Sequence, residues 1–166
     1  MPVDHKPSKR SSLFGHDRRM TNKPIVVGVD GSPASGAALR WALVEAKHRA
    51  CDVLVVHCWH LFPARGGQYS ASASELEVFE ASASKLLDDV LADAGATMDP
   101  KVRKVIRYGD ATTLLLEESA NAEMLVVGAR GAGGFTGLLV GSVTSKLTKH
   151  ASCPIVVVPR NVGETS

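Results

Sequence analysis

The chain has 166 residues, of which 45% are apolar and 22% charged, values that are ordinary for one soluble globular domain. It contains no run of about 18 apolar residues, so the sequence predicts no transmembrane span, and its start lacks the apolar core of a secretory signal. Three cysteines, Cys51, Cys58 and Cys153, include no C-x-x-C pair. This argues against a disulfide framework or a zinc site, and favours a reducing, cytoplasmic setting.

The net charge of +2 is distributed unevenly along the chain. Residues 1–23 carry six Lys or Arg and two Asp, a net charge of +4, so the remainder stands at −2. We expect residues 1–22 to be a disordered basic tail, with a nucleic-acid arm or a targeting peptide as the functional alternatives. Translation starting at Met20 would remove residues 1–19, which mass spectrometry of the native N-terminus tests. The near-neutral body argues against nucleic-acid binding through bulk charge.

Strand and helix patterns alternate from Pro24 onwards. A β-branched run over 25–30 predicts a strand buried on both faces, and Ser32 before Pro33 predicts the N-cap of a helix. A second buried strand over 51–59 is followed by a long helix over about 72–94, whose apolar residues step by three and four.

The second half of the chain continues the alternation. The alternating pattern over 102–109 predicts an exposed edge strand, and Asp110 is placed to cap a short helix. Further strands are expected over 123–129 and 153–159, with a helix between them from about Ser142 to Ala151. The chain thus predicts a single Rossmann-like α/β domain over residues 23–160, followed by a flexible C-terminus over 161–166. Its five-stranded parallel sheet is expected to have the order 3-2-1-4-5, with helices on both faces.

A glycine-rich stretch, residues 126–147, follows the fourth strand. It has no lysine followed by Ser or Thr as in a P-loop, and it fails the G-x-G-x-x-G pattern because Thr136 stands where the third glycine belongs. It does contain Gly128-x-x-Gly131-x9-Gly141-Ser142. With that spacing, and with "VVGVDGS", "VVHCW" and "VVGARG" at three strand ends, residues 24–160 resemble the universal stress protein family, in its ATP-binding form.

The residues of this motif suit a phosphate for physical reasons. Gly128 and Gly131 let the backbone approach a bulky anion, and Gly141-Ser142 opens a helix whose first amides lack intrahelical partners. Such a helix end favours phosphate through its hydrogen bonds and its dipole. Ser142 and Thr144 can add hydroxyl donors, and the Arg130 guanidinium can clamp two oxygens.

The resemblance implies further roles. Asp30 would lie near the nucleoside, the Gly28-Val29 backbone and Cys58 would line an adenine pocket, and Val127 would lie opposite. The ribose and phosphates would be surrounded by Gly128, Arg130, Gly131, Gly141, Ser142, Val143 and Thr144. A divalent metal, Mg²⁺, would bridge the phosphates. The relatives pair through the last strand, here from Pro154 to Pro159, which implies a homodimer.

Three functions remain open on the sequence alone. An ATP-binding regulator of the stress response with slow or no hydrolysis is favoured, because no general base or metal-binding carboxylate pair stands beside the glycines. A site for a cyclic nucleotide or a monophosphate, or an interaction module without nucleotide, is the first alternative. A PP-loop-like adenylating enzyme is the second, although "VDGSPAS" lacks its glycine pair. No catalytic residue and no metal ligand is predicted, and His57 and His60 are interpreted as structural.

Overall fold

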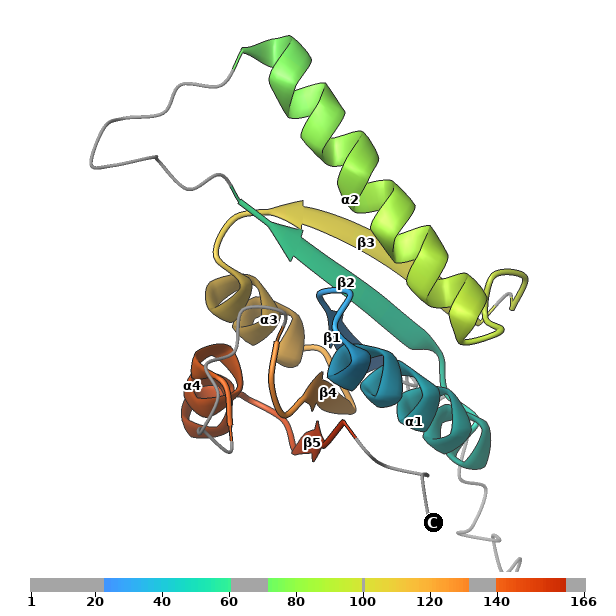
Figure 1. Cartoon of the computed structure of the whole chain (residues 1–166). Coiled ribbons are helices and arrows are strands. Elements are labelled where there is room, and N and C mark those ends of the chain that lie inside the picture. Colours follow the sequence, from blue (N-terminus) through green and yellow to red (C-terminus); the bar gives the residue numbers. More distant parts are fainter. Residues whose placement is uncertain (1–22, 61–71, 100, 132–139, 161–166) are drawn as a thin grey trace, which may run out of the picture.

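The computed structural model describes residues 23–60, 72–99, 101–131 and 140–160, in which a parallel sheet lies between two layers of helices (Figure 1). The strands are β1 (Ile25–Val29), β2 (Val53–Trp59), β3 (Val102–Tyr108), β4 (Met124–Gly128) and β5 (Ile155–Val158). The helices are α1 (Pro33–Arg49), α2 (Ala73–Asp93), α3 (Ala111–Ser119) and α4 (Ser142–His150). The predicted alternation is confirmed element by element. The expected tails, 1–22 and 161–166, lie outside the described residues.

The strand order across the sheet is β3-β2-β1-β4-β5, with every neighbouring pair parallel, as predicted. The chain builds outward from β1 to β3 and then returns to add β4 on the other side of β1. The winding therefore reverses between β1 and β4, where Gly28 lies opposite Val127. In open α/β sheets this is the place where ligands bind, at the carboxyl ends of the strands.

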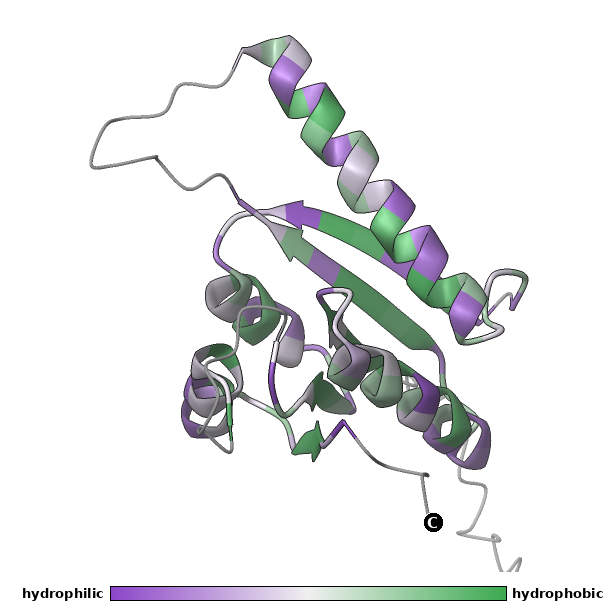
Figure 2. Cartoon of the chain, viewed as in Figure 1, coloured by the Kyte–Doolittle hydropathy of each residue, from purple (hydrophilic) through white to green (hydrophobic). Residues whose placement is uncertain are grey.

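Two hydrophobic cores cover the two faces of the sheet. On one face, Ile25, Val27 and Val126 pack under α1 and the C-terminal half of α2. On the other face, Val26, Val56 and Leu125 pack under α3 and α4. Because β1, β2 and β4 are covered on both faces, they are almost entirely apolar, as the hydrophobic colour of the central strands in Figure 2 shows; the polar residue is His57 in β2.

The two outer strands are less covered. In β3 the residues Arg103 and Lys104 are exposed, which confirms the predicted edge strand. In β5 only Val158 is fully buried, while Ile155, Val156 and Val157 are partly exposed. The sheet therefore has one polar edge and one apolar edge.

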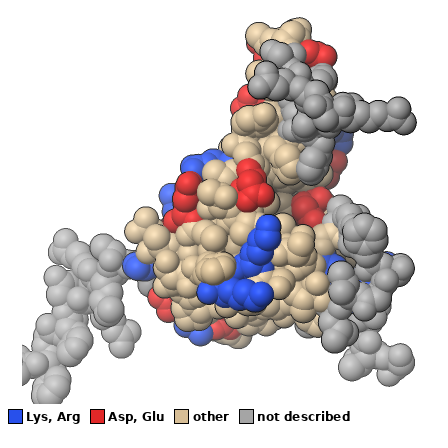
Figure 3. Space-filling model, turned by 90° about the vertical axis from the view of Figure 1, so that its left-hand side faces the viewer, with Lys and Arg blue, Asp and Glu red and all other residues tan. Residues whose placement is uncertain are grey.

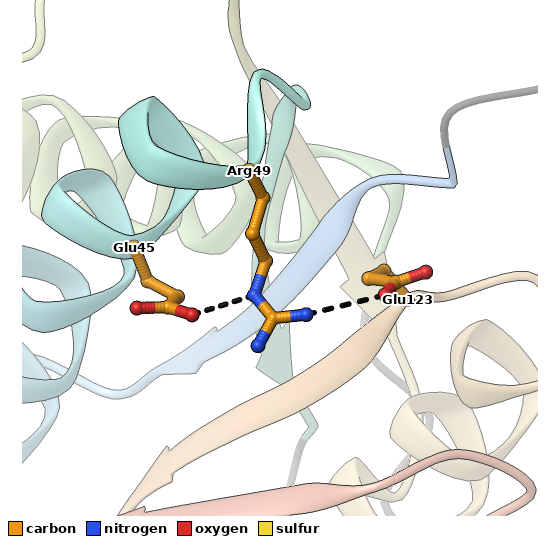
Figure 4. A network of polar contacts seen from close by, with 3 residues as sticks. All are labelled: Glu45, Arg49 and Glu123. Atoms are coloured by element: carbon orange, nitrogen blue, oxygen red, sulfur yellow. Dashed lines mark hydrogen bonds and ion pairs between the residues drawn. The ribbon is translucent and has the colours of Figure 1, made fainter. Parts of the chain in front are cut away.

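An ion-pair network fixes the amino edge of the sheet (Figure 4). Arg49, in the last turn of α1, contacts Glu45 with its Nε at 2.5 Å and Glu123 with its Nη1 at 3.4 Å. Glu123 directly precedes β4, so the pairs join the end of α1 to the start of that strand. No helix in the described part of the chain is long and apolar enough to cross a membrane.

Candidate functional site

The turn between β1 and α1 is closed by its own side chains. Oδ1 of Asp30 accepts a hydrogen bond from the Ser32 amide at 3.0 Å, and Gly31 supplies the positive φ of 80° that the turn needs. The Ser32 hydroxyl caps α1 by accepting from the Ser35 amide at 3.2 Å. In return, the Ser35 hydroxyl donates to the Ser32 carbonyl at 2.9 Å. The Ser35 amide at this helix start is thus satisfied within the turn, and Pro33 has no amide to satisfy.

The segment between β4 and α4 begins and ends at one place. The Ala129 amide continues the sheet by donating to the Val158 carbonyl at 2.8 Å, and the Gly141 amide donates to the Ala129 carbonyl at 2.7 Å. A side-chain carbon placed on Gly141 would lie 3.6 Å from the Ala129 oxygen and from Cα of Arg130. The same carbon would lie 3.7 Å from the Gly131 nitrogen, so Gly131 and Gly141 are neighbours in space. The predicted loop between them, residues 132–139, lies outside the described residues.

The two strand ends touch each other across the switch point. The Ser32 hydroxyl donates to the Arg130 carbonyl at 3.4 Å. A side-chain carbon on Gly131 would lie only 2.5 Å from Oδ2 of Asp30, so the Asp30 carboxylate lies directly against the Gly131 backbone. Asp30, Arg130, Gly131 and Gly141 therefore form one contiguous group, although 111 positions separate the first from the last.

Gly128 has a different reason to be glycine. A side-chain carbon there would lie 2.8 Å from the Ala34 carbonyl carbon and 2.9 Å from the Ser35 nitrogen, both of them backbone atoms of α1. The absence of a side chain lets α1 pack directly on the end of β4. The Gly128 carbonyl, in turn, accepts a hydrogen bond from the buried Thr144 hydroxyl at 2.9 Å, which holds the first turn of α4.

The amino end of α4 is built unlike the others. Ser32, Ser72 and Asp110 cap α1, α2 and α3 with side-chain oxygens, whereas α4 begins at Gly141 with no side-chain cap. Its first α-helical bond runs from the Ser145 amide to the Gly141 carbonyl at 2.9 Å. The amides of residues 142–144 thus precede the helical hydrogen-bond ladder. They give this end a partial positive charge and hydrogen-bond donors suited to an anion.

The carboxyl end of β2 contributes a thiol and an imidazole. Burial raises the pKa of the Cys58 thiol to about 11, so near neutral pH it is a neutral wall rather than a nucleophile. His57 is buried, and its Nδ1 donates to the Val29 carbonyl at 2.8 Å. That bond gives His57 a structural contact between β2 and β1. Among the described residues, no three His, Cys, Asp or Glu side chains group as a metal site.

Comparison with known proteins shows to which family the chain belongs. The model of the universal stress protein family matches residues 21–159. The chain belongs to the universal stress protein family. A universal stress protein of Mycolicibacterium smegmatis is 36% identical over 144 residues, which cover 86% of this chain and 47% of that relative. One from Mycobacterium tuberculosis is 33% identical over 141 residues, 84% of this chain and 44% of the relative. The chain thus spans about half the length of the curated relatives it matches.

Solved structures of universal stress proteins share the fold. UspA from Lactobacillus plantarum superposes with a TM-score of 0.67 at 24% identity, over 82% of this chain and 97% of the other. A universal stress protein in complex with cAMP gives 0.60 at 22% identity, over 82% and 96%. A family protein from Arabidopsis thaliana with AMP bound gives 0.53 at 20% identity, over 87% and 96%.

The residues that the family motif nominates fall into two sets in this universal stress protein. One set lies at the rim where β1, β4 and α4 meet: Asp30, Arg130, Gly131, Gly141 and Ser142. The other set is engaged in packing. Gly28 and Val127 lie beside Leu115 of α3, and Cys58 and Val143 border the same core, while Val29 is buried at the end of β1. Gly128 packs against α1, and Thr144 ties the first turn of α4 to the Gly128 carbonyl.

Sequence reasoning did not anticipate two serine roles at this rim. Ser32 was expected only as an N-cap, yet it also reaches the Arg130 carbonyl. Ser35 received no role, although its hydroxyl accepts from the Asp30 amide at 3.3 Å. The only sequence signal was the S-x-x-S spacing at the helix start, which predicts capping but says nothing about a contact 98 positions away.

Proposed function

We propose that this universal stress protein binds an adenine nucleotide at the carboxyl edge between β1 and β4, with ATP as the favoured ligand. The phosphates occupy the amino end of α4, where the amides of residues 142–144 and the Ser142 hydroxyl donate to them. Arg130 supplies the cation, and Asp30 accepts from the ribose hydroxyls. Cys58 and the Gly28-Val29 backbone border the base.

One observation carries the proposal. Among the four helix starts in the described residues, α4 alone has no side-chain cap, and it is held against Gly131 and Asp30 by contacts within the chain. An uncapped helix end is an anion site through its amides and its dipole. A carboxylate beside it disfavours a bare anion but suits a ligand that also carries hydroxyl donors, such as a nucleotide.

The family comparisons support an adenine nucleotide. Two solved structures with this fold are described as carrying cAMP and AMP. Because both are less than 25% identical to this chain, they support the class of ligand rather than the number of phosphates. A cyclic nucleotide or a monophosphate is therefore the second candidate.

The proposed activity is regulation of the stress response with slow or no hydrolysis. The Asp30 carboxylate lies against the Gly131 backbone, and its Oδ1 accepts a hydrogen bond from the Ser32 amide. Within the described ranges, no group of three or more His, Cys, Asp or Glu side chains could hold a metal ion. Mg²⁺ fits such a site only as a companion of the phosphates, with water completing its octahedral shell.

Two further proposals follow the family pattern. The partly exposed apolar strand β5 pairs with its copy to form a homodimer, because an uncovered apolar edge favours pairing. The protein works in the cytoplasm. Light scattering at micromolar concentration checks the first proposal, which a monomeric mass contradicts; fractionation of the native cells checks the second.

Gly141→Ala is the sharpest test of the nucleotide site. A methyl group at this position fits the described residues, whose nearest atoms stand at 3.6 Å or more, and the φ of −71° is ordinary. It would nevertheless project beside the start of α4, where the phosphates are proposed to lie. We expect isothermal titration calorimetry to show at least tenfold weaker ATP binding, with the free energy of unfolding changed by less than about 1 kcal/mol.

Gly36→Ala is the matched control, because Gly36 in α1 also has room for a methyl group, with its nearest contact at 3.5 Å from Arg40. It should leave binding unchanged. Parallel titrations with AMP and cAMP rank the ligands. Native mass spectrometry without bound nucleotide, together with no thermal shift at millimolar ATP, AMP or cAMP, would overturn the proposal.

A further inference from the structure

The N-terminal half of α2 is exposed along its length, and within the described part of the chain it meets the sheet through Phe79, whose ring lies against Trp59. Every residue from 72 to 82 is exposed, whereas Ala83, Leu87 and Leu91 further along are buried against the sheet. Figure 1 shows this half, residues 73–82, rising away from the sheet; we call it the projecting half of α2. Three helical turns with so little tertiary packing are marginal in water.

The projecting half continues the apolar stripe of the buried half. Leu76 and Phe79 precede Ala83 at helical spacing and are 37% and 41% exposed. The Phe79 ring stacks on Trp59 with centroids 6.1 Å apart, and Tyr108 meets Trp59 edge-on at 4.9 Å. Tyr108 is itself 60% exposed. Leu76 and these three rings form a contiguous apolar surface, which we call the α2 surface.

The charges on the projecting half of α2 are of one sign. Residues 72–84 contain Glu75, Glu77 and Glu80 and no Lys or Arg; the next cation is Lys85. Carboxylates are visible on the part that projects at the top of Figure 3, whereas the lower body mixes both signs. A second copy docked symmetrically on this half would bring acid against acid, which is unfavourable. The surface instead favours a partner that is apolar and cationic.

The chain itself carries such a segment. Residues 1–22 contain Lys6, Lys9, Arg10, Arg18 and Arg19 around the apolar pair Leu13 and Phe14. They lie almost entirely before residues 21–159, the part that matches the family model, so the segment belongs to this chain rather than to the shared domain. Without a core of its own, it needs another surface to bury that pair.

The segment is long enough to reach the surface. It ends beside β1 at the amino edge of the sheet, which is also where α2 ends. The 21 residues of α2 measure about 30 Å, whereas 22 extended residues span roughly 70 Å. Leu13 and Phe14 lie nine or ten positions before Lys23, about 30 Å of extended chain, which is comparable to the length of α2.

We propose that the N-terminal segment of this chain, residues 1–22, docks on the α2 surface, with Leu13 and Phe14 covering Leu76 and Phe79 and the cations facing Glu75 and Glu80. The docked segment would stabilise the projecting half of α2. The proposal does not depend on nucleotide binding.

Hydrogen exchange by mass spectrometry tests the docking, comparing the full chain with a version that starts at Met20. Removing the segment should make the amides of residues 76–82 exchange at least fivefold faster and leave those of residues 86–93 unchanged. Salt at 0.5 M should reproduce part of the effect in the full chain, because it screens the charges. Equal exchange of residues 76–82 in both versions would overturn the proposal.

Two substitutions in the full chain separate docking from helix propensity. Leu76→Ser should speed exchange of the N-terminal segment, whereas Val78→Ser should not, since Val78 lies on the opposite side of the helix and is 64% exposed. Leu13→Ser with Phe14→Ser should mimic the truncation without changing charge. Equal effects of Leu76→Ser and Val78→Ser, or protection that rises with protein concentration, would overturn the proposal, the second by indicating another copy.

Discussion

Two segments lie side by side at the carboxyl edge of the sheet, and they begin the helix that follows them in different ways. Each carries the chain from a buried strand into a helix, β1 into α1 and β4 into α4. The first uses side chains: the Ser32 hydroxyl caps α1, and the Asp30 carboxylate accepts from the Ser32 amide. The second uses glycine and backbone, and its helix begins without a cap.

The difference separates polar groups that the fold uses for its own hydrogen bonds from helix amides that it leaves available for a ligand. Closing the first turn engages Oδ1 of Asp30 and the hydroxyls of Ser32 and Ser35 in bonds within the turn, so these bonds hold the turn in place. The second segment keeps helix amides beside that turn, at a distance set by the Gly141–Ala129 hydrogen bond and the Asp30–Gly131 contact. The site is therefore a rigid turn facing an uncapped helix. The motif glycines also differ among themselves, because Gly128 serves packing and Gly141 does not.

The largest effect is expected from Gly128→Ala. Its new methyl group would overlap backbone atoms of Ala34 and Ser35 at 2.8–2.9 Å, which cannot rotate away as a side chain can. Overpacking of this kind costs about 3 kcal/mol, so the urea midpoint should fall sharply. Gly141→Ala is the control and should stay within about 1 kcal/mol of the wild type. Equal stabilities for the two variants would contradict the conclusion that Gly128 is needed for packing and Gly141 is not.

A smaller loss is expected from Ser32→Ala. The variant loses the buried cap of α1 and the hydrogen bond to the Arg130 carbonyl, so the free energy of unfolding should fall by about 1–2 kcal/mol in urea titrations. Ser142→Ala provides the comparison, since Ser142 is exposed at the start of the uncapped helix. It should change stability by less than about 0.5 kcal/mol while weakening nucleotide binding. A larger loss of stability in Ser142→Ala than in Ser32→Ala would contradict the contrast between the two segments.

Most of the fold was predictable from the sequence because its signals are local. Strands buried on both faces are almost entirely apolar, and Ser32 and Asp110 mark helix starts by residue type. The spacing Gly128, Gly131, Gly141 likewise predicted a shared site, and the structure brings Gly131 and Gly141 together with Asp30.

Other features could not be predicted because they depend on distant neighbours. The sequence pattern gives Gly128 and Gly141 the same role, and only the approach of α1 separates them. The apolar stripe of α2 is continuous along the helix, yet Leu76 is exposed and Leu87 is buried, since the sheet supports only part of the helix. Periodicity identifies the apolar face of a helix, but it does not show how much of that face packs against the sheet.

Asp110 allows a pH test of side-chain capping. Oδ2 of Asp110 accepts from the Thr113 amide at 2.9 Å, and this hydrogen bond holds the pKa of the carboxyl below its ordinary value. A carboxyl whose pKa is lowered on folding stabilises the protein above its unfolded pKa, and the stability is lost as the pH falls through the folded pKa. Asp110→Ala should therefore cost about 1 kcal/mol at pH 7, and the cost should shrink in acid below pH 4. Urea titrations at pH 7, 5 and 3 check this, and a cost that is constant with pH would contradict it.

The smallest change in stability, and the most direct test of the comparison, comes from giving α4 the cap it lacks. Gly141→Asp places a carboxylate at a position with ordinary backbone angles, where the described residues leave room for a β-carbon. Asp exceeds Gly as an N-cap by only a few tenths of a kcal/mol, so the unfolding midpoint should rise slightly at pH 7. The same carboxylate would occupy the amides proposed for phosphate and repel it, so ATP binding should fall more than in Gly141→Ala. Gly141→Asn is the neutral control and should gain similar stability with a smaller loss of affinity. A Gly141→Asp protein that binds ATP as tightly as the wild type would show that the uncapped end of α4 is not where the phosphates lie.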